Sequence, residues 1–119
     1  MSGSSHERRA HFRGKSRAGR TLAVRVAPNP TGLPVSAATH ATWRDSETRD
    51  IGVGGAFIVD LTLVVGMQIW VELQLPTTAE RFVLPAVVRW VGAQRGAGVQ
   101  FVDVDVDVLL ELNDYFEAL

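Results

Sequence analysis

The residues best suited to chemistry are a group of arginines near the start of the chain. Arg9 and Arg13 stand four residues apart in "ERRAHFRGKSR", Arg13 and Arg17 repeat that spacing, and Arg8 precedes them. A guanidinium group can bind a phosphate with two hydrogen bonds, bind the O6 and N7 edge of guanine, or stack on a base. Two such arginines could clamp a guanine nucleotide against a rigid surface, although any basic tail contains these spacings by chance.

A second candidate is the stretch "RDIGVGGAFI", residues 49–58, in which an acid precedes three glycines and an apolar run. Glycine is costly to order and has no side chain to pack, so such a cluster marks an unusual backbone shape or a close approach. The glycines do not match the G-x-G-x-x-G phosphate loop, and they lead into a strand. On their own they predict a bulged hairpin turn.

Other kinds of chemistry are disfavoured. The histidines are His6, His11 and His40, no serine has a nucleophile-elbow context, and nothing brings two carboxylates together around a pocket. The run "DVDVD", residues 103–107, resembles the start of a calcium loop, but Val108 stands where that loop requires glycine. We therefore predict no enzyme, no metal site and no cofactor, and interpret 103–107 as a strand end followed by acids near a helix N-terminus.

The charge of the chain is distributed unevenly. The net charge is −1 over 119 residues, but residues 1–20 carry six basic side chains and one acidic side chain, a net +5, which leaves −6 for the remainder. A basic arm of this kind can bind nucleic acid, an anionic membrane surface or a phosphorylated small ligand. On charge alone, a solvated flexible tail is the better interpretation.

Length and composition indicate one domain. A chain of 119 residues that is 46% apolar can bury a core of its own. There is no cysteine, which excludes disulfides and thiolate metal sites. Asp60 and Glu72 interrupt the longest apolar stretches, far short of the roughly 20 residues that a membrane span needs. We expect a soluble cytoplasmic protein.

Hydrophobic periodicity predicts about six short strands and a final helix, which suggests a small antiparallel barrel or sandwich. Pro85 lies inside one strand and argues for an edge position or a bulge there. We interpret the three tryptophans, Trp43, Trp70 and Trp90, as packing residues. The predicted strands cover Leu22–Val26, Thr39–Trp43, Ala56–Val59, Met67–Leu75, Arg81–Val91 and Val99–Val102, and the predicted helix spans Leu109–Leu119.

Taken in order, these features resemble the PilZ domain. The resemblance rests on the R-x-x-x-R element, on "DIGVGG" where the family shows D/N-x-S-x-x-G, and on "GMQIWVELQLP", "VVRWVG" and "GAGVQF" before the final helix. It covers nearly the whole chain, and residues 48–119 look particularly like small PilZ proteins of myxobacteria. The resemblance implies a six-stranded antiparallel β-barrel with a C-terminal α-helix at residues 21–119, a flexible basic arm at residues 1–20, and a non-enzymatic receptor for cyclic di-GMP.

The same resemblance implies a role for each motif residue. Arg9 and Arg13 would hold guanine edges and phosphates as the arm folds over the ligand, and Asp50 would hydrogen-bond a guanine base. Gly55 would give the backbone its turn and leave room for the ligand. Gly52 occupies the position of the family's serine, so a hydroxyl donor is absent, and losing such a hydrogen bond costs about 0.5–1.5 kcal/mol.

Two alternatives stay open. Because the gap between Arg13 and the first strand is long, Arg13 and Arg17, or Arg8, could be the working arginines. The chain could also be a degenerate PilZ protein that binds nucleotide weakly or not at all and acts as an adaptor for a protein partner. Binding to nucleic acid is disfavoured, because the body is acidic and no row of surface aromatics for stacking is evident.

Overall fold

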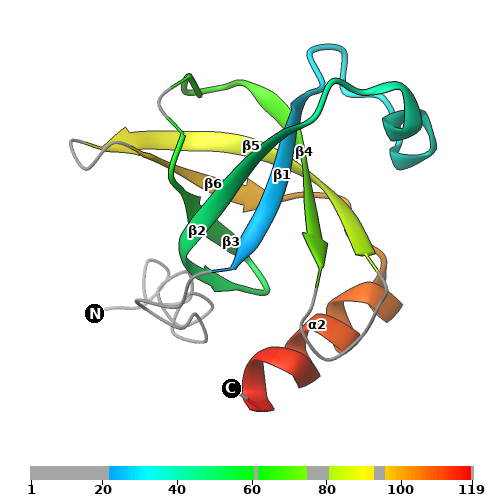
Figure 1. The fold of residues 1–119 in the computed structure, drawn as a ribbon. Coiled ribbons are helices and arrows are strands. Elements are labelled where there is room, and N and C mark those ends of the chain that lie inside the picture. Colours follow the sequence, from blue (N-terminus) through cyan, green and yellow to red (C-terminus); the bar gives the residue numbers. More distant parts are fainter. Residues whose placement is uncertain (1–21, 61, 75–80, 93–95, 119) are drawn as a thin grey trace, which may run out of the picture.

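A closed barrel of six antiparallel strands forms the body of the protein (Figure 1). The computed structural model describes residues 22–60, 62–74, 81–92 and 96–118. The strands follow the order β1-β2-β3-β6-β5-β4, and β4 pairs with β1 to close the barrel. The elements are β1 (Ala23–Pro28), η1 (Val35–His40), β2 (Arg44–Gly52), β3 (Gly55–Ile58), β4 (Gln68–Gln74), β5 (Arg81–Gly92), β6 (Gly96–Phe101) and α2 (Val106–Ala118). The predicted fold class is confirmed.

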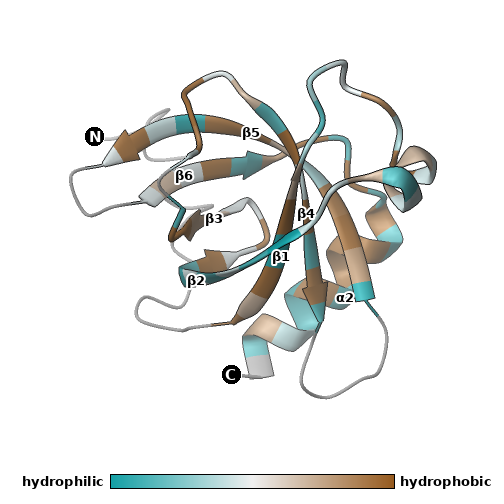
Figure 2. Cartoon of the chain, turned by 45° about the horizontal axis from the view of Figure 1, so that its top comes forward, coloured by the Kyte–Doolittle hydropathy of each residue, from teal (hydrophilic) through white to brown (hydrophobic). Residues whose placement is uncertain are grey.

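The period-two alternation of the strands separates the barrel interior from its surface. In β1, Val24 and Val26 belong to the core while Arg25 faces outward, and in β4 Ile69, Val71 and Leu73 are buried in the same core. Figure 2 shows the resulting mixture of brown and teal bands along the strands. Helix α2 covers one end of the barrel, where Leu112 and Phe116 join the core.

The predicted strand at Thr39–Trp43 is wrong. The chain forms the 3-10 helix η1 over Val35–His40, and the second strand begins only at Arg44. The small side chain of Ala38 packs on the buried Trp70, which lies on the outside of β4. The alternation was misleading because the pairing with β1 starts at Arg44, so no neighbouring strand holds the preceding residues extended.

Pro85 lies inside β5, which pairs with β4 on one side and with β6 on the other, so the predicted edge position or bulge is wrong. It pairs with Trp70 of β4, and its carbonyl accepts a hydrogen bond from the backbone N–H of Val102, just beyond the end of β6. Its own nitrogen faces the same side but carries no hydrogen to return that bond, and Pro85 is tolerated because the β5–β6 ladder ends here, beyond Ala86 and Phe101. The bulge of β5 lies further along, between Val88 and Trp90. The predicted turn at Pro76–Thr78 lies outside the described residues.

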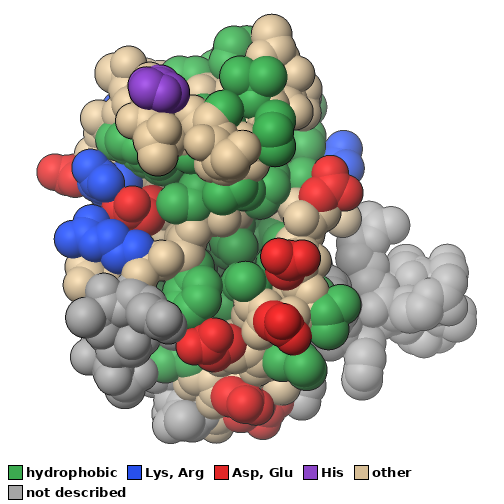
Figure 3. Space-filling model, turned by 90° about the vertical axis from the view of Figure 1, so that its right-hand side faces the viewer, with side chains coloured by type: hydrophobic (Ala, Val, Ile, Leu, Met, Phe, Trp, Pro, Cys, Tyr) green, Lys and Arg blue, Asp and Glu red, His purple; other side chains and the backbone are tan. Residues whose placement is uncertain are grey.

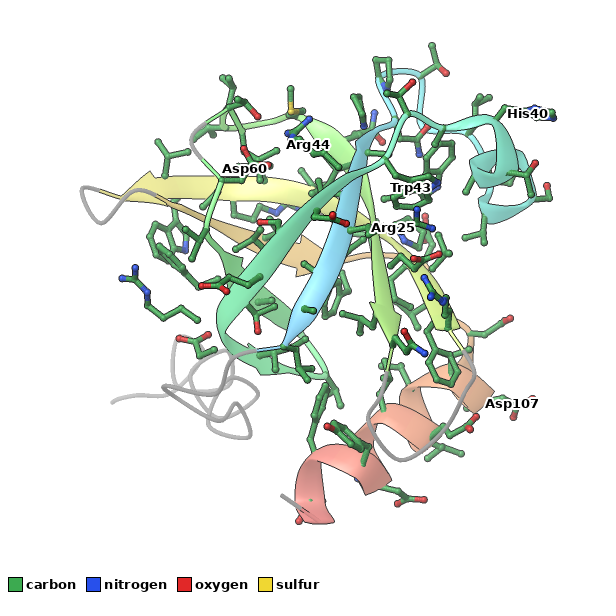
Figure 4. All side chains as sticks on the ribbon, viewed as in Figure 1. Arg25, His40, Trp43, Arg44, Asp60 and Asp107 are labelled. Carbon is green, nitrogen blue, oxygen red and sulfur yellow. The ribbon has the colours of Figure 1, made fainter. Side chains whose placement is uncertain are left out.

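Two carboxylates on the outside of the barrel are held by arginines. Asp60 accepts from Arg44 at 2.9 Å, from the hydroxyl of Thr62 at 2.6 Å and from the backbone N–H of Thr62 at 2.8 Å (Figure 4). Burial alone raises the pKa of Asp60, but these hydrogen bonds and the nearby guanidinium outweigh it and lower that pKa. They tie the start of β2 to the β3–β4 connection.

Glu72 of β4 accepts hydrogen bonds from two arginines on neighbouring strands. Arg25 of β1 donates at 2.7 and 3.1 Å, and Arg81 of β5 donates at 3.1 Å. The hydrogen bonds from Arg25 are the main reason that the pKa of Glu72 lies below its usual value. Glu72 therefore links β4 to β1, its partner at the closure of the barrel, and to β5 on its other side.

The free energy of unfolding should fall in acid. Because the pKa values of Asp60 and Glu72 are lower in the folded protein than in the unfolded chain, their stabilisation is complete above the usual carboxyl pKa of about 4. It is lost as the pH falls through the folded values. Urea unfolding at a series of pH values should show this loss. The fall in the free energy of unfolding with decreasing pH should be smaller in Asp60→Asn than in the matched variant Glu47→Gln, which alters an exposed residue of β2. An Asp60→Asn variant with the full acid slope would contradict the assignment.

Candidate functional site

The motif of residues 49–58 forms the hairpin between β2 and β3. Gly52 pairs with Gly55, and Val53 and Gly54 make the two-residue turn between them. The register shifts between Thr48 and Asp50, which places a bulge directly before the motif. The hairpin turn predicted from the glycines forms, but the bulge lies before it in β2 and not in the turn. Bulges redirect the side chains next to them, here Arg49 and Asp50.

The residues of this hairpin divide cleanly between core and surface. Ile51, Ala56 and Ile58 belong to the core cluster, so the alternating Asp50 and Phe57 point outward. Asp50 and Phe57 are paired across the two strands, and Asp50 is half-buried. An outward carboxylate thus lies beside an outward aromatic ring.

An aromatic platform, made of Phe57 and Trp90, covers this part of the outer surface. The ring centroids lie 5.3 Å apart with the planes tilted by 49°, and the guanidinium carbon of Arg49 lies 5.3 Å from the centre of the Phe57 ring. Phe57 is 7% exposed and Trp90 is 40% exposed. Trp90 packs on Phe57 as predicted but is partly exposed to solvent, which suits a surface for stacking.

Two glycines of β6 make room for the platform. A Cβ atom at Gly98 would collide with the indole of Trp90, and one at Gly96 would collide with the ring of Phe57. Both glycines face outward, since the intervening Ala97 belongs to the core. The platform therefore lies directly on the β6 backbone and extends the outer surface of β3 across to β5.

The first described residue, Leu22, is fixed beside the motif. Its backbone N–H donates to the hydroxyl of Thr48 at 3.0 Å, and the N–H of Thr48 donates to the carbonyl of Leu22 at 2.9 Å. Thr48 is fully buried and lies two residues before Asp50. The basic arm thus joins the barrel next to the hairpin that carries Asp50, Gly52 and Gly55.

The structure brings part of the predicted site together. Asp50, Gly52 and Gly55 lie on one hairpin, whereas Arg8, Arg9, Arg13 and Arg17 lie outside the described residues. Gly55 also has a purely structural reason to be glycine, because a Cβ atom there would collide with the carbonyl oxygen of Val99 in β6. The ligand role expected of Gly55 stays a prediction.

Sequence reasoning missed the aromatic platform and the neighbouring Arg49. The signal was present in two places. In "GAFI" the aromatic Phe57 stands between the core residues Ala56 and Ile58 and must therefore point outward. In "GAG" the two outward positions on either side of Ala97 are both glycine. Only the pairing of β3, β6 and β5 shows that the ring fills the space above those glycines.

Metal binding finds no support in the parts of the chain that the structure describes. They contain no group of three or more His, Cys, Asp or Glu side chains that could hold an ion. The run 103–107 leads from the end of β6 into the first turn of α2, and Asp103 has a positive φ of 52°. The described helices include none long and apolar enough to cross a membrane.

The fold is that of a small closed β-barrel domain with a C-terminal helix, and comparison with known proteins identifies its family. The chain matches the PilZ domain over residues 7–118 and belongs to the PilZ family. No enzyme family is indicated. The match includes the arginine segment. No protein with a curated function matches the chain.

Two solved structures share the fold. The PilZ domain of CeSA from a cellulose-synthesizing bacterium is 20% identical, with a TM-score of 0.53 over 86% of this chain and 90% of that one. The Bacillus subtilis inhibitor of motility (MotI/DgrA) is 15% identical, with a TM-score of 0.61 over 87% of this chain and 48% of that one.

Gly55→Ala should lower the free energy of unfolding by about 1–3 kcal/mol, because β3 and β6 must separate locally to admit the methyl group. Gly98→Ala provides the matched comparison. There the added methyl meets the half-exposed indole of Trp90, which can rotate toward solvent. Gly98→Ala should cost less in urea unfolding and should shift the tryptophan emission. A Gly55→Ala variant as stable as the wild type would contradict the close approach.

Proposed function

We propose that the protein is a non-enzymatic receptor for cyclic di-GMP. The observation that carries the proposal is the position of Asp50, an outward acid on the D-x-G-x-x-G hairpin, two residues from the point where the arginine arm is anchored. The family match, which begins at residue 7 and so includes the arm, supports it. A receptor must share the compartment of its second messenger, and a cytoplasmic location belongs to the same proposal.

The anchoring of the arm makes the proposed arrangement physically possible. Arg13 is nine residues before Leu22, and nine extended residues span at most about 32 Å. Leu22 is hydrogen-bonded to Thr48, so the whole span is available to reach the outer surface around Asp50. Arg9 and Arg13 would then bind the guanine edges and phosphates while Asp50 accepts hydrogen bonds from a guanine base.

The surface around Asp50 has the chemistry that a guanine nucleotide requires. The aromatic platform offers a partly exposed indole for stacking, and Arg49 adds a positive charge above Phe57. Gly55 is half-buried and leaves the hairpin without a side chain at that position, whereas Gly52 is buried. An acid, an aromatic surface and a guanidinium group therefore lie within one outward patch of β2, β3 and β5.

A second candidate function is that of a protein adaptor with little or no nucleotide binding. Gly52 favours it, because the serine hydroxyl of the family motif is missing at this position. The fold is shared with an inhibitor of motility, a name that describes an effect without an enzymatic reaction. The retained Asp50 and the arginine segment weigh against this alternative.

Isothermal titration with cyclic di-GMP in low salt should show binding to the wild-type chain. Arg9→Ala with Arg13→Ala should weaken it at least about 100-fold, because each lost hydrogen bond to a charged group costs about 1.5–3 kcal/mol. Asp50→Ala should weaken it about 10-fold or more by the same reasoning. The control is Asp45→Ala on the same strand. No heat at micromolar concentrations of protein and ligand would favour the adaptor instead.

Two further variants separate the remaining alternatives. If Arg17→Ala costs more affinity than Arg9→Ala, the working pair is Arg13 and Arg17. Gly52→Ser restores the hydroxyl, and the backbone of Gly52 is that of a strand without a positive φ, which serine adopts readily. Its affinity should rise by a factor of about 2–10. An unchanged affinity would show that the hydroxyl makes no contact here.

A further inference from the structure

Helix α2 carries an unpartnered apolar pair on its outer side. Val106 and Leu110 are one turn apart and are 67% and 60% exposed, whereas Leu112 and Phe116 on the opposite side are buried in the barrel core. Large apolar side chains on a helix that already has a buried face are not needed for packing against the barrel. They indicate a surface that something else covers.

Carboxylates lie beside this apolar pair. Asp107, Glu111 and Asp114 are exposed on the same outer side of α2, and within the described part of the chain no lysine or arginine pairs with them. Asp103 and Asp105 precede the helix, and residues 103–117 contain no basic side chain. Figure 3 shows acidic side chains gathered among apolar ones over the lower part of this face, and Figure 4 shows Asp107 directed away from the barrel.

The complementary pattern occurs in the same chain. Residues 1–20 carry a net charge of +5, and Phe12 stands among Arg8, Arg9, Arg13 and Lys15. An aromatic side chain flanked by cations thus matches two apolar side chains flanked by carboxylates. Phe12 is ten residues before Leu22, a span of at most about 36 Å. The start of β1 and α2 lie at the same end of the barrel (Figures 1 and 2).

We propose that the outer face of α2 is the docking surface for the protein's own N-terminal arm. Phe12 packs on Val106 and Leu110, and the arginines beside it pair with Asp107, Glu111 and Asp114. This contact forms in the absence of nucleotide. Its consequence for signalling rests on the proposed function: the arginines that bind the nucleotide cannot remain on α2, so the ligand moves the arm from the helix to the hairpin and uncovers the acidic face.

Paramagnetic relaxation on nucleotide-free protein tests the docking. The chain has no cysteine, so Ala10→Cys introduces a unique site for a nitroxide label on the arm. The label should broaden the backbone amides of α2 more strongly than those of β4 at the closure of the barrel. Raising the salt from about 0.1 M to about 1 M shortens the Debye length from about 10 Å to about 3 Å and should remove most of the broadening.

Matched variants identify the contacts. Glu111→Gln with Asp114→Asn should reduce the broadening at α2 at least about two-fold, because the arm loses charged partners. Asp45→Asn with Glu47→Gln makes the same chemical change on β2 and should leave it unaltered. Leu110→Ser, at an exposed position, should reduce it without lowering the thermal stability. Broadening that is spread evenly over the barrel, or that is unchanged by the α2 substitutions, would overturn the proposal.

A mixed sample distinguishes the occupants of the face. When labelled protein without ¹⁵N is combined with unlabelled ¹⁵N protein, broadening at α2 would show that a second copy supplies the arm and would overturn the intramolecular contact. Added cyclic di-GMP should shift the broadening from α2 toward residues 48–58. A chain that fails to bind the nucleotide but keeps the α2 broadening rejects the receptor and keeps the docking. A chain that binds it without any α2 broadening rejects only the docking.

Discussion

The pairing of β1 with β4 is the interaction on which the rest of the structure depends. Five consecutive residue pairs, from Val24 with Leu73 to Pro28 with Ile69, close the barrel. A closed ladder leaves no free strand edge and fixes which side chains point outward. Because β1 also pairs with β2, closure fixes Leu22 beside Thr48 and thereby sets where the basic arm leaves the barrel. The outward positions of Asp50 and Phe57 follow from the same register.

Most of the strands could be predicted from the sequence because their alternation reflects a local property of the backbone. The clearest case is β4, in which Ile69, Val71 and Leu73 alternate with polar or outward residues. The prediction was wrong at Thr39–Trp43, where a similar alternation occurs without a neighbouring strand and η1 forms instead. Strand formation there depends on pairing partners, which the local pattern does not reveal.

The candidate site was predictable only in the part that the motif encodes. Asp50, Gly52 and Gly55 come from one hairpin and could be placed together from the sequence. The aromatic platform could not be predicted, because Phe57, Trp90 and Gly98 lie on three strands that become neighbours only through the order β3-β6-β5. A glycine opposite a tryptophan is a compensating pair, and each residue looks unremarkable until the strands are aligned.

The glycines of the hairpin show how structure and binding can make the same demand. Gly55 must be glycine because β6 passes close behind it, whether or not a ligand binds. Its presence therefore supports the fold more directly than it supports nucleotide recognition. Gly52 lies in the strand without a positive φ, so the backbone conformation does not demand glycine there. Gly52, which departs from the family motif, is thus more informative about nucleotide binding than Gly55. A substitution at Gly52 changes the contact with the ligand and not the conformation of the turn.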